Sequence, residues 1–157
     1  MKIGRVTLSD RASAGIYEDL SGPEIERVVR ELLDPDAVFL ARLLPDDRTQ
    51  VETMLVDLAD GEQCPLILTT GGTGPCPRDI TPEATRAVIE KELPGFGEAM
   101  RAGSFRTVPT AILSRATAGV RGRTLVINLP GNPKAIRECL QPVTEAIREC
   151  LKHLQEQ

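Results

Sequence analysis

The sequence predicts a single α/β domain of three layers, in which helices cover both faces of a mostly parallel sheet. Three observations predict this class. Short, apolar, β-rich runs alternate in the first half of the chain with segments whose apolar residues recur at helical spacing. Capping residues and prolines stand where those helices would begin. The chain has 157 residues, enough for one complete hydrophobic core, so we expect residues 1–157 to form one domain.

The first half of the chain predicts three strands, each followed by a helix. The strands are expected at Lys2–Leu8, Ala37–Leu44 and Pro65–Leu68, the second of them as a buried strand. The helix after the first strand is expected to begin at Ser21, because Ser21 and Glu24 have the spacing of a capping box. Right-handed crossovers between successive strands then give a parallel sheet.

The next two helices are predicted from their first and last residues. Asp46 or Asp47 can cap a helix that ends at Gly61. Thr81 has the position of an N-cap, with a proline behind it, and predicts a helix that runs to about Lys91.

The second half of the chain has a weaker pattern. Pro94–Ser104 predicts a short helix, and Ala116–Val120 with Arg123–Asn128 predicts a hairpin or adjacent edge strands. Asn132 is expected to cap the last helix, which Pro142 should kink or divide.

The composition excludes several classes of protein. The chain has one histidine, His153, so catalysis centred on histidine is not expected. Its four cysteines contain no C-x-x-C pair, which excludes the common zinc sites. The net charge is −4 with one tyrosine, three phenylalanines and no tryptophan, a poor composition for binding nucleic acid. No run approaches the roughly 18 apolar residues of a membrane span. Scattered cysteines without a signal peptide predict a cytoplasmic protein.

Polar and glycine-rich segments follow the predicted strands, where an open parallel sheet binds its ligands. They are Ser9–Arg11, Pro45–Asp47, Thr70–Gly74 and Pro130–Asn132. Gly71–Gly74 is the strongest signal, because glycines after a strand let backbone N–H groups approach an anion. The segment has neither the Walker A pattern nor the dinucleotide fingerprint, and a plain tight turn is the alternative.

Asp46 and Asp79 are the candidate catalytic residues. Two carboxylates beside a phosphate-binding loop suit Mg²⁺, which takes one or two carboxylates together with phosphate oxygens. Helix capping by Asp46 and a turn role for Asp79 are the alternatives. Arg11, Arg78 and Arg115 could hold phosphates, or could be ordinary surface arginines.

Seven segments in order along the chain resemble the MogA/MoaB family of molybdenum-cofactor biosynthesis, which is related to the G domains of plant Cnx and animal gephyrin. The segments are Ser9–Gly15, Asp19–Pro23, Leu44–Asp46, Leu68–Gly74, Arg78–Glu83, Ala111–Arg115 and Asn128–Pro133. The resemblance covers residue 3 to about residue 150.

The resemblance implies a molybdopterin-binding fold, a homotrimer and the activity of a molybdopterin adenylyltransferase. In that reaction the terminal phosphate of molybdopterin attacks the α-phosphorus of Mg-ATP, giving adenylyl-molybdopterin and pyrophosphate. By this resemblance Asp46 and Asp79 match the acidic positions associated with catalysis and Mg²⁺. The positions that match the binding of molybdopterin or nucleotide are Asp10, Thr70, Gly71, Gly72, Thr73, Gly74, Thr81, Ser114, Pro130, Gly131 and Asn132.

Two other functions stay open at this point. The chain could be a MoaB-like carrier or assembly protein that binds molybdopterin without adenylylating it, although a binder has no need of paired Mg²⁺ ligands. A weaker alternative is a hydrolase of a nucleotide or pterin phosphate. Hand-over of the product to a molybdenum insertase is expected, and metal insertion by this chain itself is not.

Overall fold

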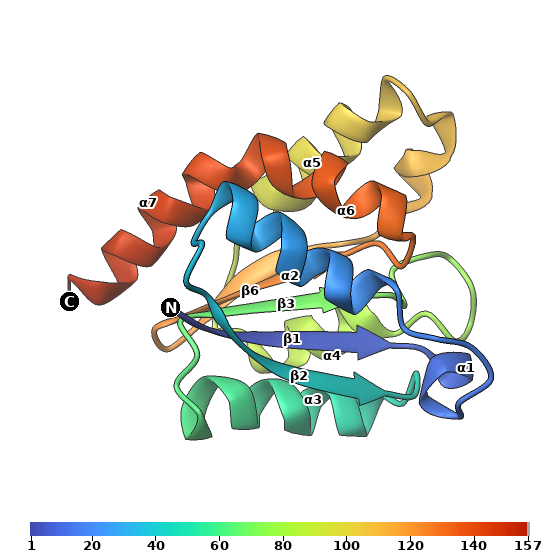
Figure 1. Cartoon of the computed structure of the whole chain (residues 1–157), viewed down its shortest axis with the longest axis horizontal. Coiled ribbons are helices and arrows are strands. Elements are labelled where there is room, and N and C mark those ends of the chain that lie inside the picture. Colours follow the sequence, from blue (N-terminus) through green and yellow to red (C-terminus); the bar gives the residue numbers. More distant parts are fainter. Residues whose placement is uncertain (157) are drawn as a thin grey trace.

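The computed structural model describes residues 1–156, and within them one sheet of six strands lies between two layers of helices (Figure 1). The strand order is β2-β1-β3-β6-β5-β4. The strands are β1 (Lys2–Leu8), β2 (Val38–Leu44), β3 (Leu66–Thr70), β4 (Lys91–Glu92), β5 (Ala118–Arg121) and β6 (Thr124–Leu129). The first four in this order are parallel, whereas β5 pairs antiparallel with β6 and β4 pairs antiparallel with β5. The predicted three-layer α/β class is confirmed.

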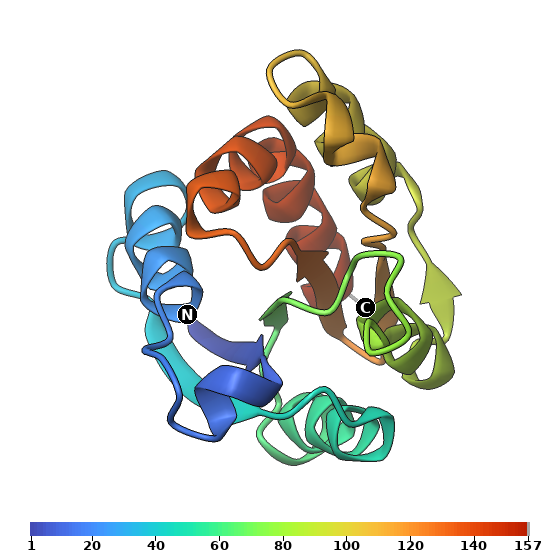
Figure 2. The ribbon, with the colours of Figure 1, turned by 90° about the vertical axis from the view of Figure 1, so that its right-hand side faces the viewer.

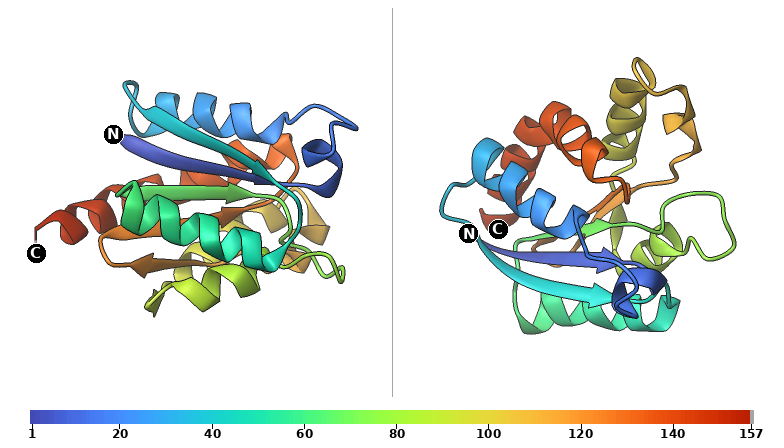
Figure 3. Two further views of the ribbon diagram at one scale, coloured as in Figure 1. Left: turned by 90° about the horizontal axis from the view of Figure 1, so that it is seen from below. Right: turned by 45° about the vertical axis from the view of Figure 1, so that its right-hand side comes forward.

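The helices divide between the two faces of the sheet, as Figures 1 and 3 show. They are α1 (Asp10–Ser13), α2 (Ser21–Leu32), α3 (Arg48–Val56), α4 (Thr81–Val88), α5 (Gly95–Phe105), α6 (Pro133–Leu140) and α7 (Thr144–Gln155). A π-turn at Asp57–Gly61 continues α3, and 3₁₀ turns occupy Pro109–Leu113 and Gln141–Val143. Helices α2, α5, α6 and α7 cover one face, and α3 and α4 cover the other.

The apolar side chains of the central strands alternate between two cores, as the period of two in a strand requires. Ile3 packs into the core beneath α2, whereas Val6 and Leu8 pack beneath α3. Leu66 and Leu68 likewise face the first core, and Ile67 faces the second. Because both faces are covered, β3 is buried along its whole length and begins with three consecutive apolar residues, whereas β1 also buries the polar side chains of Arg5 and Thr7.

Several predicted boundaries are confirmed. The side chain of Asp47 accepts a hydrogen bond from the Gln50 amide and caps α3, and the helical turns that follow α3 end at Gly61. β5 and β6 form the predicted hairpin. Asn132 caps α6, and Pro142 lies in the 3₁₀ turn that separates α6 from α7.

Four predictions about elements are wrong. Thr81 does not cap α4 but is its first residue, and its hydroxyl donates to the Gly71 carbonyl instead. Ser21 does not cap α2; the carboxylate of Asp19 does, by accepting the Gly22 amide at 2.9 Å. β2 is not buried but is the edge strand of the sheet, and its Val38 side chain is 62% exposed. α4 ends at Val88 rather than near Lys91, because the chain turns there to pair β4 with β5.

No helix in residues 1–156 is long and apolar enough to cross a membrane.

Candidate active site

Four loops meet at the carboxyl edge of the parallel strands, the edge that Figure 2 faces. The loops after β1 and β2 exchange hydrogen bonds, from the Asp10 amide to Asp46 Oδ2 (3.1 Å) and from the Asp46 amide to Asp10 Oδ1 (3.0 Å). The loops after β3 and β6 are joined by the Thr70 hydroxyl, which donates to the Pro130 carbonyl at 2.7 Å. The convergence predicted from the strand ends is therefore present in the structure.

The loop Gly71–Gly74 is held through its carbonyl groups. The carbonyls of its first two residues accept from the hydroxyl and the amide of Thr81, at 2.8 and 3.1 Å. The carbonyls of the next two accept from the amide and the Nε of Arg115, both at 2.8 Å. All four carbonyl oxygens of the loop are thus bound by two residues that are distant in the sequence.

The N–H groups of the same loop differ: the Gly71 amide donates to the Leu129 carbonyl at 3.2 Å, and those of Gly72, Thr73 and Gly74 have no such partner among residues 1–156. Gly71 and Gly72 have φ values of +96° and +65°, and a Cβ at Gly72 would lie 2.3 Å from the Thr81 hydroxyl oxygen. This conformation requires glycine and leaves a row of free donors that suits a phosphate.

A first cavity, which we call the acidic cavity, has a volume of about 550 Å³. The carboxylates of Asp10, Asp46 and Asp79 line it together with Gly71, Gly72 and Gly131. Arg78 pairs with Asp10 through two hydrogen bonds of 2.9 and 2.8 Å. The other lining residues include Arg11, Tyr17, Glu18, Asp19 and Leu20.

Asp46 has the most unusual carboxylate in this cavity. Its Oδ1 is buried and accepts no hydrogen bond from the described residues. Burial raises the pKa of Asp46 above its ordinary value, and the nearby negative charges of Asp10 and Asp79 act in the same direction. The Arg78 guanidinium instead lowers the pKa of Asp10. Asp46 thus carries a buried oxygen that accepts no hydrogen bond from the described residues, although the charge of Arg78 partly offsets the rise in its pKa.

Asp79 is positioned by the loop that precedes α4. Its Oδ2 accepts the Cys76 amide at 2.9 Å, and its carbonyl accepts Arg115 Nη2 at 2.8 Å. Arg115 also forms an ion pair with Glu83 on α4. Sequence reasoning offered Arg115 as a phosphate ligand, whereas in the structure it anchors the glycine loop and Asp79.

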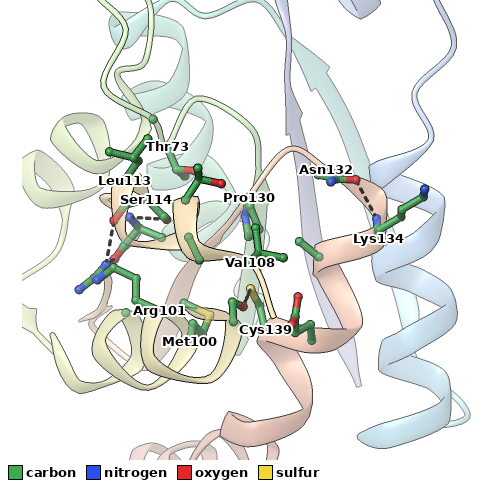
Figure 4. Close-up of a pocket in the computed structure, with 18 residues that line it drawn as sticks. Thr73, Met100, Arg101, Val108, Leu113, Ser114, Pro130, Asn132, Lys134 and Cys139 are labelled. Carbon is green, nitrogen blue, oxygen red and sulfur yellow. Dashed lines mark hydrogen bonds between the residues drawn. The ribbon is translucent and has the colours of Figure 1, made fainter. Parts of the chain in front are cut away.

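A second cavity, which we call the apolar cavity, has a volume of about 400 Å³ and lies between α5 and α6 (Figure 4). Met100, Val108, Leu113 and Cys139 give it apolar walls, and Thr73, Gly74, Ser114, Pro130 and Asn132 also line it. Arg101 also lines it, and its Nη1 donates to the Ser114 carbonyl at 3.3 Å and to the Ala116 carbonyl at 2.8 Å. In the part of the chain described, neither Arg101 nor Lys134 forms an ion pair with a carboxylate.

The predicted binding residues divide between the two cavities. Asp10, Asp46, Asp79, Gly71, Gly72 and Gly131 line the acidic cavity, and Thr73, Gly74, Ser114, Pro130 and Asn132 line the apolar one. Thr70 and Thr81 line neither; both are fully buried, and their hydroxyls hold backbone carbonyls of the neighbouring loops. The sequence did not predict Arg101 as a site residue. Its one local signal is its position four residues after Gly97, which places both residues on the same face of α5.

Comparisons with known proteins identify the family of this chain. The family model described as "Probable molybdopterin binding domain" matches residues 4–149. The molybdopterin adenylyltransferase of Helicobacter pylori is 55% identical over 149 residues, which cover 95% of this chain and 85% of that protein. The enzyme of the same name from Escherichia coli K12 is 46% identical over 153 residues, covering 98% of this chain and 78% of that protein.

The solved structures include a close match. The molybdopterin biosynthesis enzyme MoaB from Thermus thermophilus superposes with a TM-score of 0.90 at 41% identity, covering 99% of this chain and 97% of that one. The fold, the extent of the family match and these identities lead to one conclusion: the chain belongs to the molybdopterin-binding domain family of molybdenum-cofactor biosynthesis proteins.

Proposed function

We propose that this chain is a molybdopterin adenylyltransferase that transfers AMP from ATP to the terminal phosphate of molybdopterin. The names of its relatives at 46–55% identity support this activity. The observation that carries it is the row of free amides at Gly72–Gly74, which lies where the two cavities adjoin. A transfer between two phosphate-bearing substrates needs such a shared phosphate site between two pockets.

The residues that line the two cavities favour one arrangement of the substrates. The acidic cavity takes the nucleotide, and the apolar cavity takes the pterin. Arg101 and Lys134 supply positive charge to the apolar cavity, which suits the phosphate that molybdopterin carries. The volume of about 400 Å³ lies in the range of small-molecule pockets.

The carboxylates of the acidic cavity fit Mg²⁺. Asp46 Oδ1 is a buried oxygen without a partner, and Asp79 lines the same cavity. Within residues 1–156 no group of three or more protein ligands is gathered for a metal. This suits an ion that takes one or two carboxylates and fills its remaining positions with phosphate oxygens and water. When bound, Mg²⁺ would neutralise the charge that develops on the phosphates.

The chain's own residues do the rest by positioning. The amides of Gly72–Gly74 hold phosphate oxygens, and Thr81 and Arg115 keep those amides aimed at them. The phosphate oxygen of molybdopterin, already ionised at neutral pH, attacks the α-phosphorus of ATP. The bond between the α-phosphorus and the bridging oxygen breaks, and pyrophosphate leaves with its electron pair. No general base is needed, which agrees with a chain whose one histidine lies far along α7.

The experiment that tests this function incubates the purified protein with Mg²⁺ and ATP, with and without molybdopterin. Adenylyl-molybdopterin and pyrophosphate are expected only when both substrates are present. Free phosphate from ATP without molybdopterin would indicate a hydrolase. No reaction, with molybdopterin bound, would indicate a carrier.

We further propose that the chain forms a homotrimer. The end of α5 and the segment after it expose four large apolar side chains, at Phe105, Val108, Ile112 and Leu113, with exposed fractions of 45–62%. A patch of this kind on one segment is typical of a surface that another subunit covers. Light scattering is expected to give three times the mass of the chain, and Ile112→Glu is expected to lower it.

The setting of the reaction follows from its chemistry. Adenylyl-molybdopterin is an activated intermediate, so a molybdenum insertase that takes it over is the expected partner. The free cysteines Cys64, Cys76, Cys139 and Cys150 suit a reducing compartment, and we place the protein in the cytoplasm.

A further inference from the structure

One wall of the acidic cavity is formed by the segment between α1 and α2, which brings two apolar side chains to the cavity beside the carboxylates of Glu18 and Asp19. Tyr17 and Leu20 line the cavity and are 50% and 60% exposed, and Ile16 beside them is 69% exposed. The Tyr17 hydroxyl shares a hydrogen bond with Ser9 Oγ at 2.9 Å, at the point where β1 ends. The other loops bring carboxylates and glycines to the same cavity. The cavity therefore combines a charged part with a flat aromatic surface.

A buried polar network holds this wall in place. Arg5 is only 8% exposed although its side chain is charged, because it lies on the inner strand β1. Its Nη1 donates to Asp19 Oδ2 at 3.0 Å. The Thr7 hydroxyl donates to the same oxygen at 2.8 Å, and the other oxygen of Asp19 caps α2. Gly22 leaves room for the network, since a Cβ there would lie 2.3 Å from Arg5 Nη1. The segment is thus fixed at Asp19 while its apolar side chains stay exposed.

We propose that Tyr17 is the stacking platform for the adenine base of ATP and that Leu20 packs against the same ring. The base is the one flat aromatic part of the nucleotide, whereas the ribose and the phosphates are polar or charged and cannot stack on a ring. With the phosphates at Gly71–Gly74 and the carboxylates of Asp46 and Asp79 beside them, Tyr17 and Leu20 are the exposed large apolar side chains among the remaining lining residues. Base–aromatic stacking supplies affinity that is separate from the phosphate contacts. This inference rests on the proposed function, because it assumes that the acidic cavity binds the nucleotide.

The fluorescence of Tyr17 can report directly on the binding of ATP. Tyr17 is the single tyrosine of the chain and the chain contains no tryptophan, so the tyrosine emission of the protein comes from this one side chain. Saturating Mg-ATP is expected to quench that emission, after correction with free tyrosine amide for light absorbed by the nucleotide. Inorganic tripolyphosphate, which has the phosphates but no base, is expected to compete with ATP and leave the emission unchanged.

Variants separate stacking from a structural role. Tyr17→Ala is expected to weaken ATP binding about fivefold or more, in line with the loss of a stacked base, and to leave tripolyphosphate binding unchanged. Tyr17→Phe keeps the ring and is expected to restore ATP binding. Val38→Ala changes an exposed apolar residue at the start of edge strand β2, outside the acidic cavity; it is the control and is expected to bind as the wild type does.

Two results would overturn the inference. One is ATP that binds by equilibrium dialysis without changing the Tyr17 emission. The other is equal ATP affinity of Tyr17→Ala and the wild type. Both can occur in a protein that still makes adenylyl-molybdopterin, so they do not bear on the proposed function. If the protein binds no ATP at millimolar concentration, that result overturns both the inference and the proposed function.

Discussion

Replacing Asp46 by asparagine is expected to stabilise the protein and to abolish its activity. The buried Oδ1 of Asp46 has no hydrogen-bond partner, and burial raises the pKa of the carboxyl. An unsatisfied buried group costs about 1–3 kcal/mol. Asp46 is only partly buried and its Oδ2 accepts the Asp10 amide, an interaction that asparagine keeps. We therefore expect a gain of about 1 kcal/mol in the free energy of unfolding, or about 2–4 °C in Tm for a chain of this size.

The pH dependence of this gain has a definite sign. The pKa of Asp46 in the folded protein lies above the ordinary value of 3.8. The folded state therefore binds this proton more tightly than the unfolded state does. That favourable contribution is complete below the unfolded pKa and is lost as the pH rises through the folded pKa. The advantage of Asp46→Asn should thus be present at neutral pH and disappear as the pH falls through the pKa of Asp46.

Differential scanning calorimetry at several pH values, with and without Mg²⁺, measures these effects. Mg²⁺ is expected to raise the Tm of the wild type and not that of Asp46→Asn, since a ligand stabilises the state that binds it. Asp36→Asn removes an exposed carboxylate elsewhere and controls for net charge. An Asp46→Asn protein that is less stable than the wild type at neutral pH would refute the reasoning.

Three further substitutions test the glycine loop. Gly72→Ala is expected to lower stability by about 1–3 kcal/mol and to reduce adenylylation, because a side chain at φ +65° meets the Thr81 hydroxyl; thermal unfolding at wild-type Tm would contradict this. Thr81→Val leaves the buried Gly71 carbonyl without its donor and should cost about 1–3 kcal/mol in urea unfolding, whereas Thr81→Ser should not. Arg115→Lys keeps the charge but loses the fork that holds Gly74, so kcat/KM should fall by up to about 100-fold, and unchanged kinetics would exclude the anchoring role.

The parts of the site that the sequence predicted are those that depend on local signals and on the topology of a parallel sheet. Asp10, Asp46 and the glycine loop follow strands, and the carboxyl ends of parallel strands share one edge. Their proximity could therefore be expected, and the hydrogen bonds between Asp10 and Asp46 bear it out. Their chemical roles stay predictions.

The parts that the sequence did not predict depend on contacts between distant residues. Arg115 is 41 positions from Gly74, and only the fold shows that it binds the loop instead of a ligand. The exposure of β2 depends on which side of β1 it pairs with, which its apolar sequence does not specify. The apolar cavity likewise exists only because α5 and α6 pack side by side. The sequence around Arg101 contains no motif that predicts its position in the lining of this cavity.

The central claim is that the acidic cavity and the glycine loop together catalyse adenylyl transfer to molybdopterin, with Asp79 essential to the reaction. The most direct measurement compares the formation of adenylyl-molybdopterin by the wild type and Asp79→Ala, with molybdopterin binding measured on both. We expect the wild type to form product, and Asp79→Ala to bind molybdopterin with little change in Kd but to form none. Near-wild-type turnover by Asp79→Ala would contradict the account.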